Sequence, residues 1–285
     1  MDAVLLALAS AALFGAMTVA LRFALSRGTS AEVGAALTIL PAFALAATAA
    51  AADAAANGAP DVLAAWPFAL AGVIAPGGSQ ILFTLAIRDA GPSRTSVLVG
   101  SAPLVSVAIA LVLLNEPLEA GLIGGAILIV AGGLLLIGER VRPDTFRLTG
   151  LAFALAATVL FATRDNLLRW LSLDTDVPPA LAAAATLGSG TVVVLAYAFL
   201  RARPSGAGAG RFALAGLCFG LSYLALFEAY YRGRVTVVSP LVATESLWGV
   251  VLSALLVGRS ELIGRHLVAG AALIVAGGAL IGVFR

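Results

Sequence analysis

The chain contains ten long apolar stretches, and they constrain its fold more than any other feature of the sequence. Each is about 17–24 residues long, close to the roughly 20 helical residues that cross a bilayer core about 30 Å thick. The stretches are continuously apolar, without the alternation that is typical of a membrane β-barrel. The sequence therefore predicts an all-α integral membrane protein with ten transmembrane helices, at Val4–Leu25, Val33–Ala52, Ala65–Ile87, Thr95–Leu114, Gly121–Ile137, Leu148–Trp170, Pro179–Leu200, Phe212–Tyr231, Val235–Val257 and His266–Phe284.

The composition agrees with lipid as the main solvent. Of the 285 residues, 61% are hydrophobic and only 11% are charged, whereas ordinary soluble domains have roughly 25% charged residues. The seventeen basic residues are all arginines and lie scattered, so no basic face for nucleic acid is expected. With one cysteine (Cys218) and one histidine (His266), we expect no disulfide framework, no metal site and no cofactor.

An internal repeat divides the chain into two similar parts. Phe68–Gly72 recurs as Phe212–Gly216 at a shift of 144 residues. Gly125–Gly133 recurs as Gly270–Gly278 at a shift of 145, with eight of nine residues identical. Alanine, leucine and glycine match easily by chance in membrane sequences, but a nearly constant shift over several helices favours a duplication.

The repeat predicts the organisation of the chain. We expect a first five-helix repeat over residues 1–141 and a second over residues 142–285, forming one membrane domain without a soluble domain. Five is an odd number, so the second repeat enters the membrane from the opposite face. Transporters built from such inverted repeats bind their substrate near the midplane, between the repeats, and alternate access around that site.

The distribution of arginines predicts the orientation. Connections after odd-numbered spans hold twelve arginines, and the opposite face holds four. Because cytoplasmic loops carry the excess of positive charge, we expect both termini on the periplasmic side of a bacterial inner membrane.

The residues Leu113–Pro117 (Leu-Leu-Asn-Glu-Pro) at the end of span four, followed by a glycine-rich span, resemble the drug/metabolite transporter superfamily, and more narrowly its ten-helix EamA-type branch. Glu116 and Glu261 mark the same place in the two halves. The resemblance implies export of amino acids and related metabolites, aromatic amino acids above all. Two departures stand out: the first span has no embedded glutamate of the kind that small multidrug relatives use for protons, and Trp248 replaces a proline in span nine.

Charged residues inside a span are costly, so they are candidates for function. We consider four, namely Arg164, Asp165, Glu228 and Glu245. An arginine and a carboxylate facing one cavity would match the two ends of a zwitterionic amino acid, and we expect Arg164 and Glu245 in these roles. Alternatively, Arg164 forms a structural ion pair with Asp165 or Glu245. Glu228 lies near a span end, where solvation at the membrane interface is expected.

Further candidates come from proline, polar and aromatic residues. Pro76 and the glycines after it predict either a discontinuous helix that exposes backbone groups to a ligand, with Gln80 on the same face, or a packed kink. Aromatic rings at helical spacing suit a flat apolar solute. The predicted substrate-binding residues are Phe14, Ser79, Gln80, Ser101, Phe161, Arg164, Tyr197, Tyr223, Glu245 and Trp248.

Together these features favour a secondary transporter that exports amino acids, aromatic or apolar ones first, by alternating access through a central cavity. The expected partners are a small-molecule substrate and the lipid bilayer, in a monomer or a weak homodimer. The Gly121–Gly125 and Gly278–Gly282 spacings permit close packing of spans five and ten, or a homodimer contact. The sequence contains no glycine-rich phosphate-binding loop with a lysine, so we do not expect ATP to drive transport directly. Alternatives are a carrier of another metabolite or drug class, an integral membrane enzyme, or a passive pore.

Overall fold

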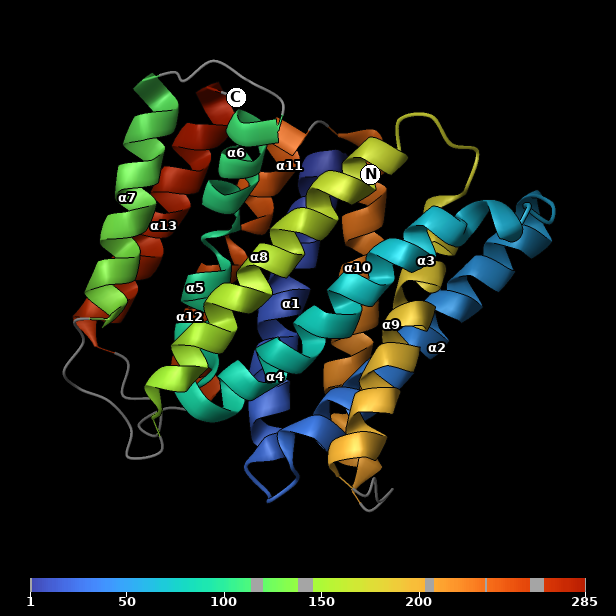
Figure 1. Ribbon diagram of the computed structural model, residues 1–285, viewed down its shortest axis with the longest axis horizontal. Helices are drawn as coiled ribbons and strands as arrows, with labels where there is room; N and C mark the ends of the chain where they lie inside the picture. Colours follow the sequence, from blue (N-terminus) through green and yellow to red (C-terminus); the bar gives the residue numbers. More distant parts are fainter. Residues whose placement is uncertain are drawn as a thin grey trace.

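The structure is a computed structural model that describes residues 2–113, 120–137, 146–202, 208–233, 235–256 and 264–284. Every regular element in these ranges is a helix (Figure 1). The elements are α1 (Ala3–Leu25), α2 (Ala31–Asn57), η1 (Leu63–Ala65), α3 (Trp66–Gly72), η2 (Val73–Gly78), α4 (Ser79–Ala90), α5 (Pro92–Val99), α6 (Ala102–Leu113), α7 (Ala120–Ile137), α8 (Leu148–Leu171), α9 (Pro179–Arg201), η3 (Ala209–Phe212), α10 (Ala213–Arg232), α11 (Val235–Val242), α12 (Glu245–Leu256) and α13 (Arg265–Phe284).

Six helical segments are long and apolar enough to cross a membrane, and they coincide with the predicted spans one, two, three, six, seven and eight. The class of a multi-pass helical membrane protein is therefore confirmed. In predicted spans five, nine and ten the described residues contain shorter apolar helical stretches, at Ile123–Leu135, Glu245–Leu256 and Arg265–Leu280. Glu116 and Glu261, the paired markers from the sequence, lie outside the described residues.

Spans four and nine are each interrupted in the middle, whereas the sequence predicted continuous helices. Between α5 and α6, the Ser101 N–H donates to the Leu98 carbonyl three residues back, at 3.0 Å, and its hydroxyl donates to the same carbonyl. Between α11 and α12, Thr244 does the same with Leu241, at 3.1 Å for the N–H. A side-chain hydroxyl that competes for a backbone carbonyl loosens the helical ladder, and the residues involved are 143 positions apart.

The predicted weak point in span three is a true interruption. Ala75 has φ −144° and ψ 118° between two helical segments, directly before Pro76. A Cβ on Gly190 of α9 would lie 2.6 Å from Pro76 Cγ, so the bend is packed closely against that helix.

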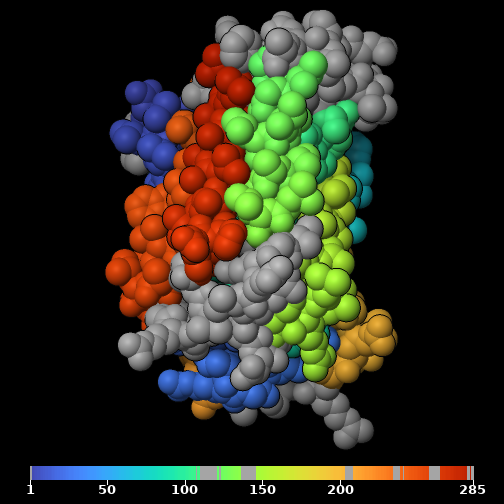
Figure 2. All heavy atoms as spheres, turned by 90° about the vertical axis from the view of Figure 1, so that its left-hand side faces the viewer, coloured from blue at the N-terminus to red at the C-terminus, as the bar shows by residue number. Residues whose placement is uncertain are grey.

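In Figure 1, α1 and α8 cross the middle of the view, with α8 in front of α1. α1 packs mainly on α10, and α8 mainly on α4. α2 packs on α9, and α5 on α12. Figure 2 shows α7 and α13 side by side at one end of the bundle. In Figure 1 both chain ends lie near the same edge of the molecule.

The contact between α7 and α13 depends on glycines. A Cβ on Gly132 would lie 2.6 Å from the Gly270 carbonyl oxygen and 2.8 Å from a side-chain carbon of Ile274. A Cβ on the neighbouring Gly133 would meet nothing within 4 Å. The two backbones therefore approach closely along one face of α7 only, as small residues permit in membranes.

We expect Gly132→Val to destabilise the protein by about 1–3 kcal/mol, because the added methyl groups push the two helices apart. The measurement is thermal unfolding in detergent, followed by tryptophan fluorescence. Gly133→Val is the matched control, since it adds the same side chain with the same helix propensity to open space. Equal unfolding temperatures for the two variants would contradict the close contact.

Candidate solute-binding pocket

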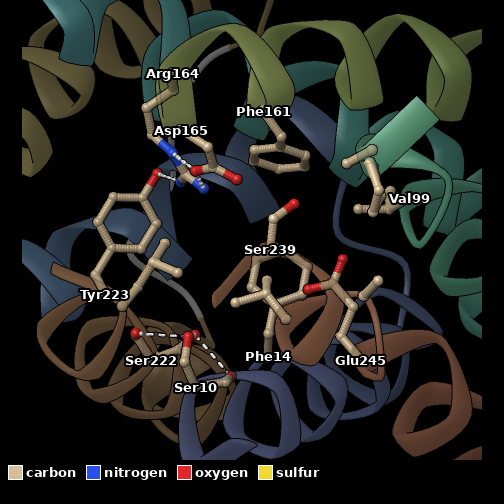
Figure 3. A pocket seen from close by; sticks show the side chains of 15 residues that line it. Ser10, Phe14, Val99, Phe161, Arg164, Asp165, Ser222, Tyr223, Ser239 and Glu245 are labelled. Atoms are coloured by element: carbon tan, nitrogen blue, oxygen red, sulfur yellow. Dashed lines mark hydrogen bonds and ion pairs between the residues drawn. The ribbon is translucent and has the colours of Figure 1, made fainter. Parts of the chain in front are cut away.

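A pocket lies where α1, α8 and α10 meet both interrupted helices (Figure 3). Polar and charged groups gather in it, although the helices around them are apolar. Transporters commonly place their substrate site at such helix interruptions. Its lining consists of Ser10, Phe14, Val99, Ala102, Pro103, Phe161, Arg164, Asp165, Ser222, Tyr223, Leu226, Ser239, Val242, Ala243 and Glu245.

Arg164 is held in place by its own helix and by α10. Its Nε and Nη2 donate to one carboxylate oxygen of Asp165 at 2.9 and 2.6 Å, and Nη1 donates to the Tyr223 hydroxyl. The guanidinium carbon lies 4.9 Å from the Tyr223 ring centroid and 5.3 Å from that of Phe161. The Asp165 carboxylate and the two aromatic faces together offset the free-energy cost of burying the Arg164 charge.

Glu245 is the charged residue of the pocket without a matched partner. It is the first residue of α12 and only 6% exposed. Among the described residues its carboxylate makes no hydrogen bond or ion pair, so the Arg164–Glu245 pair considered from the sequence is not formed there. Figure 3 shows this carboxylate across the pocket from Arg164, with Phe14, Phe161 and Ser239 between them. The positive end of the α12 dipole favours its charge.

Two serines fix α1 to α10 at the edge of the pocket. The Ser10 hydroxyl donates to the Ser222 carbonyl, and the Ser222 hydroxyl to the Ser10 carbonyl, both at 2.9 Å. The two hydroxyl oxygens lie 3.0 Å apart (Figure 3). Sequence reasoning missed this pair, because no pattern connects two serines 212 positions apart.

A cluster of phenylalanines closes the pocket on the side of Phe14. Its ring centroid lies 5.1 Å from that of Phe83, 5.7 Å from that of Phe161 and 6.3 Å from that of Phe219. All four side chains are buried. Rings from α1, α4, α8 and α10 therefore meet at the centre of the bundle and form an apolar wall beside the charged groups.

The structure brings five of the ten predicted site residues into the pocket and leaves five outside its lining. Phe14, Phe161, Arg164, Tyr223 and Glu245 line it. Ser101 is buried next to the lining residue Ala102, where its hydroxyl is bonded to the Leu98 carbonyl. Asp165, a charged candidate from the sequence that was not among the ten, lines the pocket as well, and its ion pair with Arg164 is formed.

Two of the five aromatic residues expected in the cavity, Trp248 and Tyr197, lie outside its lining. Trp248 is 41% exposed. Its Cβ lies against Gly15 of α1, since a Cβ added to Gly15 would lie 2.7 Å from it. The indole therefore points away from the centre. Tyr197 lies half-buried near the end of α9, with the Arg201 guanidinium carbon 6.0 Å from its ring centroid.

Ser79 and Gln80 are fully buried at the start of α4 but do not line the pocket. Within the part of the chain that the structure describes, neither the Ser79 hydroxyl nor the Gln80 amide has a hydrogen-bond partner. Glu228 binds Arg232 one turn further along α10 at 2.6 Å, and both side chains are partly exposed. This agrees with the interfacial position expected for Glu228.

Comparison with known proteins gives a family and a fold. A sequence model of the EamA-like transporter family matches residues 1–138 and 148–283. A solved crystal structure of a protein with no stated function shares 21% sequence identity, with a TM-score of 0.69 over 98% of this chain and 95% of that chain. At that identity the likeness shows the fold alone. No protein with a curated description matches.

Proposed function

Because the chain belongs to the EamA-like transporter family, we propose that its pocket binds an amino acid, with aromatic or apolar side chains preferred. The protein then exports this amino acid by alternating access. The protein is a helical membrane transporter; the cargo and the mechanism are the proposal. Its setting would be a bacterial inner membrane, with both termini periplasmic, as the excess of arginines in the connections after odd-numbered spans favours.

Alternating access is supported by helix contacts that occur in matched pairs. α1 packs on α10 much as α8 packs on α4, and these pairs exchange under the shift of about 145 residues seen in the sequence. The interruptions at Ser101 and Thr244 use the same hydrogen bonds. We infer ten spans in two inverted five-helix repeats, with the pocket between them.

The observation that carries the substrate proposal is the buried, unpartnered carboxylate of Glu245 facing Arg164 across two phenylalanine rings (Figure 3). A buried carboxylate is costly without a cation, and a solute ammonium would supply one. Phe14 and Phe161 offer an apolar surface to the side chain of the solute. The solute carboxylate would bind the guanidinium N–H groups of Arg164 that Asp165 and Tyr223 leave free.

A second candidate cargo is an apolar amine without a carboxylate. It is favoured by the charges in the lining, which hold two carboxylates, Asp165 and Glu245, against one arginine. Since Asp165 already occupies one side of Arg164, a cation that binds Glu245 alone would leave that ion pair intact.

Flux measurements in proteoliposomes test the function and separate the two cargo classes. We expect saturable uptake of radiolabelled phenylalanine that unlabelled phenylalanine inhibits more strongly than phenethylamine, which lacks the carboxylate. The reverse order of inhibition would favour the amine. Flux that does not saturate would indicate a pore, and no flux of either compound would contradict the proposed cargo.

A further inference from the structure

A line of small and hydroxyl-bearing residues runs between α5 and α12, and we call it the seam. On each helix its residues follow the spacing i, i+3 and i+7, which places them on one helical face. The seam consists of Ser93, Ser96 and Gly100, which ends the α5 helix, and of Ser246, Gly249 and Ser253 on α12.

The two helices touch along the seam at backbone distance. A Cβ on Gly100 would lie 2.7 Å from the Ser246 Cβ, and a Cβ on Gly249 would lie 2.2 Å from the Ser96 hydroxyl oxygen. Gly100 therefore faces Ser246, and Ser96 faces Gly249, so residue numbers rise on one helix as they fall on the other. Ser93 and Ser253 come next in this antiparallel order.

Three hydroxyls in the seam have no hydrogen-bond partner among the residues that the structure describes, namely those of Ser93, Ser96 and Ser253. Each is at most 2% exposed. The hydroxyls of Thr95 and Ser246 donate to the carbonyls of Gly91 and Ala243, which lie just before the first residues of α5 and α12, so other hydroxyls of these helices do have partners. An unpaired buried hydroxyl costs free energy that alanine, with nearly the same volume, would avoid.

The seam begins where the pocket ends. Val99 and Glu245 line the pocket, and Gly100 and Ser246 follow them directly in the chain. On the far side of both interruptions, α6 and α11 contribute Ala102, Pro103, Ser239 and Val242 to the pocket. The pocket thus lies toward α6 and α11, and the seam continues from it in the opposite direction, between α5 and α12.

We propose that the seam is the closed half of the solute pathway, and that Ser93, Ser96 and Ser253 are its polar lining when it opens. This inference rests on the proposed alternating-access function. In the present state α5 and α12 are in contact and the three hydroxyls are buried. When the helices separate, water and the passing solute bind these hydroxyls, which lowers the free energy of the open seam relative to the closed one.

Cysteine accessibility tests this directly. In a Cys218→Ser background, Ser96→Cys and Ser253→Cys are exposed to a membrane-impermeant methanethiosulfonate reagent in vesicles of each orientation. We expect both to react from one membrane face only. Ser239→Cys, in the pocket on the other side of the interruption, should react from the opposite face. Val251→Cys, on α12 between Gly249 and Ser253 of the seam but 47% exposed on the outside of the bundle, should react from neither face.

Two further measurements test whether a cysteine reacts because the seam opens or only because the substitution has disturbed the packing. Ser93→Ala with Ser253→Ala removes two unpaired hydroxyls, so it favours the closed seam and should slow the labelling of Ser96→Cys several-fold. A disulfide between Ser93→Cys and Ser253→Cys, the next pair in the antiparallel order of the seam, should stop phenylalanine uptake, and dithiothreitol should restore it.

The proposal is overturned if Ser96→Cys and Ser253→Cys stay unlabelled while Ser239→Cys reacts fully, or if all three react from the same face. Labelling does not depend on the cargo. Saturable phenylalanine uptake with an unreactive seam would therefore reject the seam alone, whereas a reactive seam without uptake would reject only the proposed cargo.

Discussion

Glu245→Gln is expected to abolish the binding and transport of amino-bearing solutes while the protein stays folded. Removing one partner of a buried ion pair costs about 2–5 kcal/mol in binding, which corresponds to about a 30-fold or larger loss of apparent affinity. Glutamine keeps the shape of the side chain but cannot neutralise an ammonium group. The measurement is the concentration dependence of phenylalanine uptake in proteoliposomes.

The stability of the same variant separates binding from folding. The Glu245 carboxylate has no partner among the described residues, so removing its charge should leave the thermal unfolding temperature in detergent unchanged or raise it. Glu228→Gln is the matched control, because it makes the same change in a partly exposed ion pair with Arg232. Uptake by Glu245→Gln at the rate of this control would assign Glu245 a structural role.

Arg164→Gln is expected to destabilise the protein, and Asp165→Asn added to it should restore much of the lost stability. The single change leaves the buried Asp165 carboxylate without its guanidinium partner, which costs about 3–5 kcal/mol. The double change removes both charges, and the coupling energy between the two sites follows from a double-mutant cycle. Thermal unfolding in detergent measures both effects.

Transport by the double variant then distinguishes a binding role for Arg164 from a structural one. If Arg164 binds the solute carboxylate, the double variant should be folded but should not transport phenylalanine. A double variant with normal phenylalanine transport would show that the pair only holds α8 in place beside α10, through the contact of Arg164 with Tyr223.

The site was only partly predictable because the rules that find buried charges differ from those that place aromatic and polar side chains. A charge in an apolar stretch is identified by its cost alone, and Arg164, Asp165 and Glu245 all line the pocket. An aromatic ring in the same stretch can face lipid, a neighbouring helix or a cavity at little difference in free energy. Trp248 and Tyr197 were therefore assigned to the cavity from the sequence, and they lie outside its lining.

The sequence alone determined the solvent of this protein and its secondary structure, because twenty apolar residues in a row can satisfy their backbone groups in lipid only as a helix. Pro76 also marked the break in span three. Which helices meet, and that spans four and nine break, was decided by the tertiary structure. The hydroxyls that end α5 and α11, the paired Ser10 and Ser222, and the unpaired serines of the seam look alike in the sequence. Only the neighbouring helix determines whether a given hydroxyl bends its own backbone, joins two helices or stays unpaired.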